Sequence, residues 1–377
     1  MTSTSVSGRK LLFFVTEDYY FVSHRLALAM EARREGYDVC VVTRVRESGD
    51  TIRAAGLRLL PFENARSSLN PVSELSTLIR LIRLYRRERP DIVHHVAMKP
   101  VLYGSIAARL AGPPVVVNTI AGMGWLFISE SRWARWLERP VREVLKRVLS
   151  TGIALVQNPD DAGLLVGAGV LKSRIRRVQG SGVDLRVFVP HPEPEGTPVV
   201  VLAARMLRDK GVGEFVAAAR LLQHRGVAAR FVLAGVPDSM NPASIMDENL
   251  SAWVGEGVVE HLGWVDNMPG LLATCHLVCL PSYREGLPKS LIEAAAAGKA
   301  IVTTDVPGCR EVVRHADNGF LVQPRDVAGL ADALERLIED SDLRRRMGTR
   351  GRVRAEQEFG LDAVVEQTLA IYREALG

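Results

Sequence analysis

The sequence of 377 residues predicts an α/β protein made of two doubly wound, Rossmann-like domains that face a central cleft. Short, almost wholly apolar runs alternate with helical patterns of roughly 10 to 15 residues, which is typical of parallel sheets covered by helices on both faces. Residues 191–198 (HPEPEGTP) are rich in proline and have the composition of a linker. We therefore expect a hinge near residues 188–197.

The first predicted domain covers residues 1–187. A strand is expected at 10–16, then a loop at 17–23 and a helix at 24–34. Further apolar runs predict strands at 37–43, 92–95, 114–118 and 153–157.

The second predicted domain covers residues 197–360 and repeats this order, with a strand at 198–204, a loop at 205–211 and a helix at 212–224. Further strands are expected at 229–234, 258–262, 277–280 and 300–303. A helical pattern at 361–376 lies in the C-terminal segment 361–377; whether that segment packs back onto the first domain is not decided by the pattern. Ligands bind at the carboxyl ends of such strands, so the cleft is the expected site.

Charge is unevenly distributed along the chain. Residues 1–190 carry 28 Lys and Arg against 17 Asp and Glu, although the whole chain has a net charge of only +5. This excess suits an anionic ligand or surface, and equally well ordinary solvated charge. The four cysteines lack paired metal-ligand spacing and are expected to be buried. The apolar run at 11–15 is too short for a signal peptide, so we expect a cytoplasmic protein.

The most informative segment is residues 280–297, L-P-S-Y-R-E-G-L-P-K-S-L-I-E-A-A-A-A. A buried strand is expected to end at Pro281, and a helix to begin around Pro288. Gly286 lets the backbone approach a ligand, and the first helical N–H groups can hold a diphosphate. Glu285 and Glu293 only accept hydrogen bonds, so they suit hydroxyl-rich groups such as a hexose and a ribose.

Two cations follow the first strand of the second domain in A-R-M-L-R-D-K-G, residues 204–211. Arg205 and Lys210 are thereby placed at the carboxyl ends of the strands, where Glu285 is also expected. Fixed cations at this edge can stabilise the negative charge that develops on a departing diphosphate. The alternative is an ordinary basic surface loop.

Together these segments resemble family 4 of the retaining, nucleotide-sugar-dependent glycosyltransferases, which have the two-Rossmann-domain (GT-B) architecture. Its most specific marks here are residues 285–294, 204–211 and 263–268 (G-W-V-D-N-M). The resemblance implies that Arg205 and Lys210 contact the donor diphosphate and Glu285 the donor sugar, as catalytic residues. The donor-binding residues that it implies are Gly286, Leu287, Pro288 and Lys289, with Glu293 on the ribose of a UDP-sugar.

The first half resembles bacterial enzymes that assemble surface polysaccharides and lipid-linked oligosaccharides, through residues 16–25, 91–100 and 117–124. This implies transfer of an N-acetylhexosamine or another hexose to a polyprenyl-diphosphate-linked saccharide. The candidate acceptor-binding residues are Ser23, His24, His94, His95, Lys99, Asn118 and Thr119. The alternative interpretation of His94 and His95 is that each has a structural role. The alternative interpretation of Lys99 is that it is a solvated loop lysine.

Two departures from the family pattern affect the first domain. Tyr19, Tyr20 and Phe21 replace a glycine-rich loop, so phosphate binding by that loop is not expected. Residues 118–122 lack the histidine that many members carry, so this loop offers no general base. A retaining double displacement would require a carboxylate nucleophile, and the loops of the first domain that face the cleft offer none. We therefore expect same-face substitution, in which the leaving diphosphate accepts the proton of the acceptor hydroxyl.

A nucleotide-sugar 2-epimerase of similar architecture is the alternative, and it would turn over without an acceptor. Neither first strand is followed by G-x-G-x-x-G, which argues against a dehydrogenase, and the absence of a recognisable module argues against a nucleic-acid partner. No Asp-x-Asp pair lies in a suitable loop and Asp160-Asp161 opens a predicted helix, so we expect no metal and no other cofactor.

Two basic segments with apolar or aromatic residues suggest peripheral contact with the inner face of an anionic cytoplasmic membrane. Residues 125–149 contain Trp133 and Trp136 among several arginines and favour the membrane. Residues 78–89 (LIRLIRLYRRER) favour the simpler interpretation of an amphipathic helix that packs its apolar side on the sheet.

Overall fold

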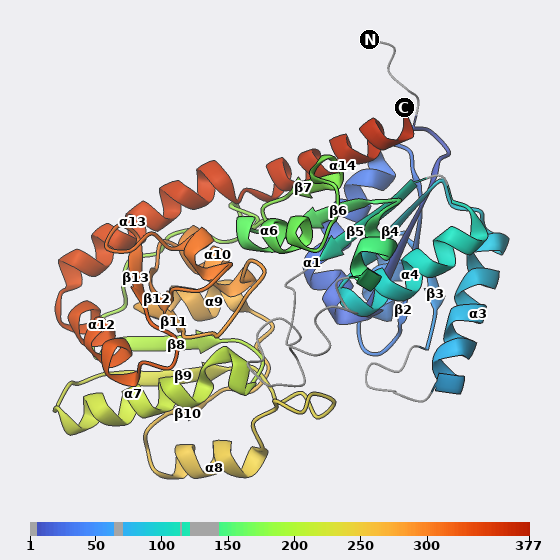
Figure 1. Ribbon diagram of the computed structural model, residues 1–377. Helices are drawn as coiled ribbons and strands as arrows, with labels where there is room; N and C mark the ends of the chain where they lie inside the picture. The colour runs from blue at the N-terminus through green and yellow to red at the C-terminus, as the bar shows by residue number, and fades with distance from the viewer. Residues whose placement is uncertain (1–5, 64–70, 114, 121–142) are drawn as a thin grey trace. The chain divides into compact units, whose positions relative to one another are not determined.

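The computed structural model describes the chain except for residues 1–5, 64–70, 114 and 121–142 (Figure 1). The chain forms two compact units, Met1–Ser181 with Ala363–Gly377, and Gly182–Asp362. Each unit contains one parallel sheet, and the predicted α/β class is confirmed. Within the described residues, none of the helices combines the length and apolarity that crossing a bilayer requires. The predicted hinge near 188–197 stays a prediction.

The sheet of the first unit has seven strands in the order β3-β2-β1-β4-β5-β6-β7. They are β1 (Lys10–Glu17), β2 (Asp38–Arg44), β3 (Arg58–Pro61), β4 (Ile92–Val96), β5 (Val115–Ile120), β6 (Ile153–Val156) and β7 (Ile175–Arg177). The connecting helices include α1 (Asp18–Arg34), α2 (Gly49–Ala54), α3 (Pro71–Glu88), α4 (Met98–Ala111), α6 (Pro159–Gly167) and η2 (Lys172–Arg174). Every strand predicted for this half is present. The sequence did not reveal β3 and β7, which are short and only partly buried.

Burial on both faces of the sheet explains why β1 is apolar from Leu11 to Val15. Successive side chains of a strand point to opposite faces of the sheet. The Phe13 ring lies 5.6 Å from the Phe21 ring of α1, whereas Phe14 lies 5.6 Å from Phe62. Both phenylalanines are at most 1% exposed, so both faces of the sheet are covered.

The loop predicted at residues 17–23 is wrong, because α1 begins at Asp18 directly after β1. The Asp18 carboxylate is fully buried and accepts hydrogen bonds from the backbone N–H groups of Arg46 and Ser48, at 2.6 and 3.0 Å. These partners follow β2, 28 and 30 residues further along the chain. The start of the helix is therefore stabilised by a contact that local patterning does not reveal.

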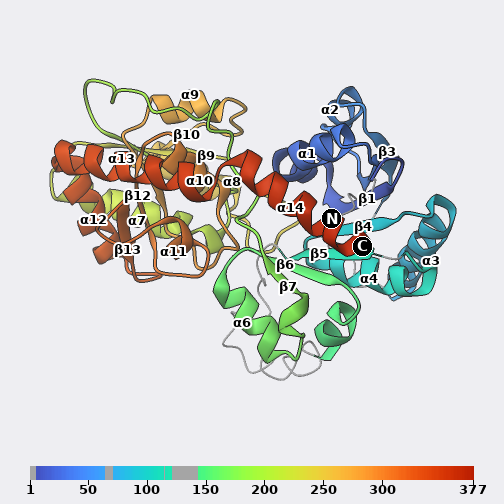
Figure 2. The ribbon, with the colours of Figure 1, turned by 90° about the horizontal axis from the view of Figure 1, so that it is seen from above.

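The predicted C-terminal helix is present as α14 (Leu361–Leu376), and its residues from Ala363 onward belong to the first unit. Figure 2 shows α14 beside α1 and the β6–β7 end of the sheet. Arg373 pairs with Glu35 at 2.6 Å, and the Gln367 side chain donates to the carbonyl of Arg177 at 3.0 Å. The helix thus contributes both polar and buried apolar contacts to the first unit.

The sheet of the second unit has six strands in the order β10-β9-β8-β11-β12-β13. They are β8 (Val199–Ala203), β9 (Arg230–Ala234), β10 (Glu260–His261), β11 (Leu277–Leu280), β12 (Ala300–Thr304) and β13 (Gly319–Val322). The helices are η3 (Arg208–Lys210), α7 (Val212–His224), α8 (Asp247–Gly255), α9 (Met268–Ala273), α10 (Lys289–Ala296), α11 (Cys309–Val312), α12 (Val327–Glu339) and α13 (Ser341–Glu358). All strands predicted for this half are present. The four cysteines of the chain are buried and unpaired, as expected.

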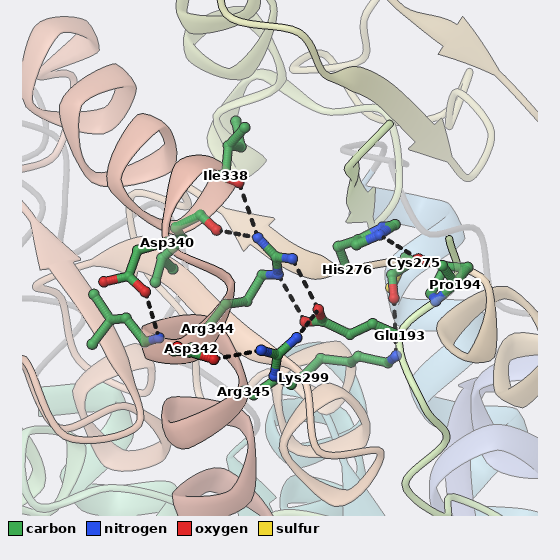
Figure 3. A network of polar contacts seen from close by, with 12 residues as sticks. Glu193, Pro194, Cys275, His276, Lys299, Ile338, Asp340, Asp342, Arg344 and Arg345 are labelled. Atoms are coloured by element: carbon green, nitrogen blue, oxygen red, sulfur yellow. Dashed lines mark hydrogen bonds and ion pairs between the residues drawn. The ribbon is translucent and has the colours of Figure 1, made fainter. Parts of the chain in front are cut away.

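The proline-rich segment 191–198 is anchored to the second unit by polar contacts (Figure 3). Arg344 of α13 is only 4% exposed and donates from Nε and Nη2 to the two carboxylate oxygens of Glu193, at 2.7 and 2.9 Å. His276 donates from Nε2 to the carbonyl of Pro194 at 3.0 Å. Charge-assisted, two-pronged bonds of this kind are strong, so part of the segment is held in place despite its linker-like composition.

Candidate active site

The three residues predicted to be catalytic lie on two loops at the carboxyl ends of the strands of the second sheet. Arg205 and Lys210 follow β8, whereas Glu285 lies between β11 and α10. Strands β8 and β11 are hydrogen-bonded neighbours in a parallel sheet, so their carboxyl ends lie at one edge. The tertiary structure therefore brings these two sequence segments together.

A close approach of backbones joins the two loops. Gly211 has a φ of +71°, and a Cβ atom there would lie 2.1 Å from the carbonyl oxygen of Pro281. Only glycine adopts this conformation and spacing without strain. The carbonyl of Asp209 accepts a hydrogen bond from the Tyr283 backbone N–H at 2.9 Å, and the Ser282 hydroxyl oxygen lies 2.9 Å from the same carbonyl oxygen.

Lys210 and Glu285 form an ion pair between the loops. The distance from Lys210 Nζ to Glu285 Oε1 is 2.5 Å, and the Ser282 hydroxyl donates to the same oxygen at 2.7 Å. The side chains of Lys210 and Glu285 are 21% and 10% exposed. A carboxylate held by both a cation and a hydroxyl has little freedom to reorient, which suits a residue that must orient a ligand.

Arg205 has a partner that the sequence analysis missed. Its Nη1 atom donates to Asp238 Oδ2 at 2.7 Å, and Asp238 lies in the loop after β9. The carboxylate is 14% exposed and the guanidinium 39%. Because β9 is the neighbour of β8, an acidic residue a few positions after β9 was the available signal.

The helix α10 begins at Lys289 and has Pro288 as its N-cap, one residue from the predicted start. Lys289 Nζ lies 3.3 Å from Glu293 Oε1 within the helix. Glu293 is 6% exposed, and burial raises the pKa of its carboxyl although Lys289 opposes the shift. Gly286 and Leu287 complete the loop, and the Leu287 side chain is buried.

In the first unit, His95 and Asn118 lie in a buried hydrogen-bond network. Both side chains are fully buried. His95 Nδ1 lies 2.7 Å from Asn118 Oδ1 and its Nε2 lies 3.0 Å from the Tyr85 hydroxyl, while Ser105 also donates to Asn118. Both ring nitrogens are thus engaged by the protein, which supports a structural role for His95.

His94 is also fully buried, in the middle of β4. Its Nδ1 atom lies 2.5 Å from the Tyr372 hydroxyl of α14, and its Nε2 atom lies 2.6 Å from Thr119 Oγ1. Burial, followed by the nearby Arg25 charge, holds the pKa of His94 well below its usual range. The imidazole is therefore neutral near pH 7, and with Thr119 it borders a small internal cavity.

The remaining acceptor-site candidates of the first unit, Lys99, Ser23 and His24, do not share the contacts of His94 and His95. Lys99 donates to Glu74 at 3.0 Å and lies over the Tyr103 ring at 5.4 Å, so it is not a solvated loop lysine. Ser23 is exposed on α1. The His24 ring stacks on the Tyr20 ring with centroids 4.1 Å apart.

Some predicted features lie outside the described residues. These include Trp133, Trp136 and most of the segment 125–149, as well as the end of the motif at 117–124. Where the chain is described, no group of three or more His, Cys, Asp or Glu side chains is arranged to hold a metal ion.

Acid should destabilise the protein through His95. Burial lowers the pKa of this histidine from 6.5 to about 4, so its stabilising contribution is complete above pH 6.5 and is lost as the pH falls toward 4. Between pH 6.5 and pH 5 we expect the free energy of unfolding to fall by about 2 kcal/mol through His95 alone. Urea denaturation at both pH values measures this loss. His95→Gln should shrink it and His224→Gln, on an exposed histidine, should not; equal pH dependence in all three proteins would contradict the assignment.

Comparison with known proteins gives matches over both units. The family model "Glycosyl transferases group 1" matches residues 186–354, and "Glycosyl transferase 4-like" matches residues 10–149. The chain is 30% identical to the N,N'-diacetylbacillosaminyl-diphospho-undecaprenol alpha-1,3-N-acetylgalactosaminyltransferase of Campylobacter jejuni, over 84% of this chain and 85% of that protein. It is 37% identical to the N-acetyl-alpha-D-glucosaminyl L-malate synthase of Bacillus anthracis, over 81% and 80%.

The crystal structure of Anabaena Alr3699/HepE in complex with UDP-glucose has a similar fold. The TM-score is 0.76 at 19% identity, covering 96% of this chain and 99% of the Anabaena chain. The two parallel α/β sheets, of seven and six strands, therefore match the two-domain fold predicted from the sequence.

Proposed function

The chain belongs to the glycosyl transferases group 1 family, also called glycosyltransferase family 4, and from this premise we propose its substrates and mechanism. It is a GT-B glycosyltransferase that uses a nucleotide-sugar donor. We propose that it transfers an N-acetylhexosamine or another hexose, with retention, from a UDP-sugar to a polyprenyl-diphosphate-linked saccharide in surface polysaccharide assembly.

The observation that carries the donor part of the proposal is the ion pair between Lys210 and Glu285 at the carboxyl edge of the second sheet. One partner is a cation suited to a diphosphate, and the other is an acceptor suited to sugar hydroxyls. In the proposal the UDP-sugar lies along this pair, with Arg205 also on the diphosphate. The loop 286–289 contacts the donor, and Glu293 accepts hydrogen bonds from the ribose hydroxyls.

The proposed reaction needs charge stabilisation more than a protein base. Sugar transfer passes through an oxocarbenium-like state, and the bond from the anomeric carbon to the diphosphate oxygen breaks while the bond to the acceptor oxygen forms on the same face. Arg205 and Lys210 stabilise the leaving diphosphate, whose oxygen takes the proton of the acceptor hydroxyl. His95 supplies no base, because both of its ring nitrogens are hydrogen-bonded within the first unit.

The choice of a lipid-linked acceptor rests on similarity and charge. The Campylobacter relative is named for an undecaprenol-diphosphate-linked acceptor, whereas the Bacillus relative is named for L-malate. The excess of 28 basic over 17 acidic residues in residues 1–190 favours an acceptor that carries a diphosphate. The alternative, a nucleotide-sugar 2-epimerase, requires no acceptor.

A two-stage assay tests the proposal. Thermal unfolding with a panel of nucleotide sugars should identify the donor, since a bound ligand raises the melting temperature. The protein is then incubated with this donor in the presence of EDTA. The three reactions contain no acceptor, a short-chain polyprenyl-diphosphate saccharide, or L-malate. We expect sugar transfer to the lipid-linked saccharide and none to malate. Turnover of donor alone to a 2-epimer would favour the epimerase, and loss of activity in EDTA that Mg²⁺ restores would refute the metal-independent mechanism.

We also propose that α3 contacts the membrane that carries such an acceptor. Leu81 and Tyr85 are buried on the first sheet, which agrees with the packing predicted for residues 78–89. Val72, Leu75 and Ile79, however, are 77%, 58% and 40% exposed. Leu75 and Ile79 are one helical turn apart, and exposed arginines follow on the same helix. Exposed apolar residues next to basic ones suit the headgroup boundary of an anionic bilayer.

Vesicle binding checks this surface. The protein should co-sediment with vesicles that contain phosphatidylglycerol, bind less to neutral vesicles, and be released by high salt because salt screens surface charge. The double change Leu75→Ser and Ile79→Ser should reduce co-sedimentation several-fold. Leu171→Ser, at a residue 63% exposed elsewhere on the first unit, is the matched control and should bind as the original protein does. Undiminished binding by the double variant would assign the contact to another surface.

A further inference from the structure

Arg25 of α1 is a buried cation that faces an internal cavity of the first unit. Arg25 is only 6% exposed. The cavity has a volume of about 10 Å³ and lies at the carboxyl ends of β4, β5 and β6, where His94, Thr119 and Gln157 border it together with Thr368 of α14. A space of this size admits roughly one water-sized group.

The charge of Arg25 has no counter-ion among the described residues. Its Nε atom lacks any hydrogen-bond partner there, and its Nη1 atom reaches only the carbonyl of His24 at 3.4 Å, the long limit of a hydrogen bond. A guanidinium does not lose its proton in proteins, so the charge persists. Burial holds the pKa of Tyr372 above its usual range and that of His94 well below, so both neighbours are uncharged near pH 7.

Two other arginines are buried in the described part of the chain, and both form ion pairs that fit a structural role. Arg44 donates to Glu17 at 2.5 Å, and Arg344 donates through two nitrogens to Glu193. Both are as deeply buried as Arg25 or nearly so, at 9% and 4% exposed. Each therefore has a carboxylate within its own unit, as a buried charge requires, whereas Arg25 has none in the described part of its unit.

The other groups around the cavity suit the same kind of ligand. The Gln157 side chain is 6% exposed and has no hydrogen-bond partner among the described residues, so its amide N–H groups remain available. We propose that Arg25 and Gln157 bind one anionic oxygen of the acceptor's diphosphate in this cavity. The identity of the acceptor rests on the proposed function; the need for an anionic oxygen does not.

Equilibrium binding tests the site without catalysis. The protein is first saturated with UDP to occupy the donor site, and its melting temperature is then measured with geranyl diphosphate, inorganic pyrophosphate or sulfate at equal ionic strength. Geranyl diphosphate and pyrophosphate should raise the melting temperature of the original protein. A rise with pyrophosphate and sulfate but not with the prenyl compound would assign the site to free anions and overturn the acceptor assignment.

Variants at Arg25 separate binding from structure. Arg25→Met should abolish the ligand-induced rise, while its melting temperature without ligand should equal or exceed that of the original protein because an unpaired buried charge is removed. Arg25→Lys keeps the positive charge but lacks the several N–H donors of the guanidinium group, so it should retain part of the ligand-induced increase in melting temperature. Arg34→Met on the exposed end of the same helix is the matched control. A lower melting temperature of Arg25→Met without ligand, with the rise retained, would make Arg25 structural and overturn the proposal.

Kinetics complete the test once transfer is observed. Arg25→Met should raise the KM for the lipid-linked acceptor by about 10-fold or more, as expected for loss of a charge-assisted hydrogen bond, and leave the Kd of UDP unchanged. An unchanged acceptor KM would overturn the inference while the proposed function stands. Conversely, Arg25-dependent binding of diphosphate by a protein that transfers no sugar to the lipid-linked saccharide would overturn the proposed function and leave the anion site in place.

Discussion

The Glu285→Gln variant should lose about 10²-fold or more of kcat, with the Kd of UDP nearly unchanged. Glutamine has the same shape and retains an oxygen that can accept from Ser282, so the loop should keep its structure. It lacks the negative charge that faces Lys210 at 2.5 Å and that the proposed sugar contact requires. The proposed partner of Glu285 is the sugar and not the nucleotide, which is why the loss is expected in kcat.

Single-turnover kinetics and UDP titration measure the two quantities separately. Glu256→Gln provides the control, because Glu256 forms an exposed ion pair with Arg220 in the same unit, and exposed pairs contribute little. Its kcat should match that of the original protein. If Glu285→Gln instead binds UDP poorly and keeps its kcat, the carboxylate contacts the nucleotide and the proposed orientation of the donor is wrong.

Arg205→Ala should also reduce kcat by about 10²-fold, because it removes a fixed positive charge from the position proposed for the leaving diphosphate. Here the Kd of UDP should rise as well, since the diphosphate carries charge both before and after transfer. The change also leaves the Asp238 carboxylate, 14% exposed, without its guanidinium partner. Asp238 would then repel the diphosphate, which adds to the loss.

The double variant Arg205→Ala, Asp238→Asn distinguishes these two contributions. It should recover part of the UDP affinity but little of kcat, because the repulsion is removed while the stabilising charge is still missing. Arg208→Ala is the matched control, since Arg208 lies three residues further in the same loop, is exposed, and bonds to the carbonyl of Pro242. Comparable losses in Arg208→Ala would mean that the loop responds to any change of charge, and would remove the specific role of Arg205.

The long strands were predictable because they are buried on both faces. In β1 every position from Leu11 to Val15 is apolar, and this continuous pattern is visible without any knowledge of the neighbouring strands. The strands β3, β7 and β13 were missed because they contain three or four residues and are partly exposed, so their pattern is weak. Their place in the sheet follows from hydrogen bonds to the neighbouring strands.

The donor-site candidates were predictable to the extent that they follow buried strands. Arg205, Lys210 and Glu285 were assigned to one edge because parallel neighbouring strands end together. Their individual partners were not predictable: Asp238 and Ser282 reach the site from positions whose side-chain directions depend on the loop backbones. The histidines show the same limit, since both rings face partners inside the first unit rather than the surface.

The sequence by itself determined the α/β class, the strands that are buried on both faces and the segments that end at the sheet edges, because each depends on the pattern of apolar residues along the chain. Only the tertiary structure decided that α1 starts at Asp18, that Tyr372 contacts His94, and that Arg25 has no counter-ion among the residues that the structure describes. Those facts depend on groups far apart in the sequence: the His94–Tyr372 contact spans 278 residues. The sequence shows only that a charged residue lies on a helix. Whether that charge is buried without a partner, which is energetically costly, depends on the parts of the chain that pack around it.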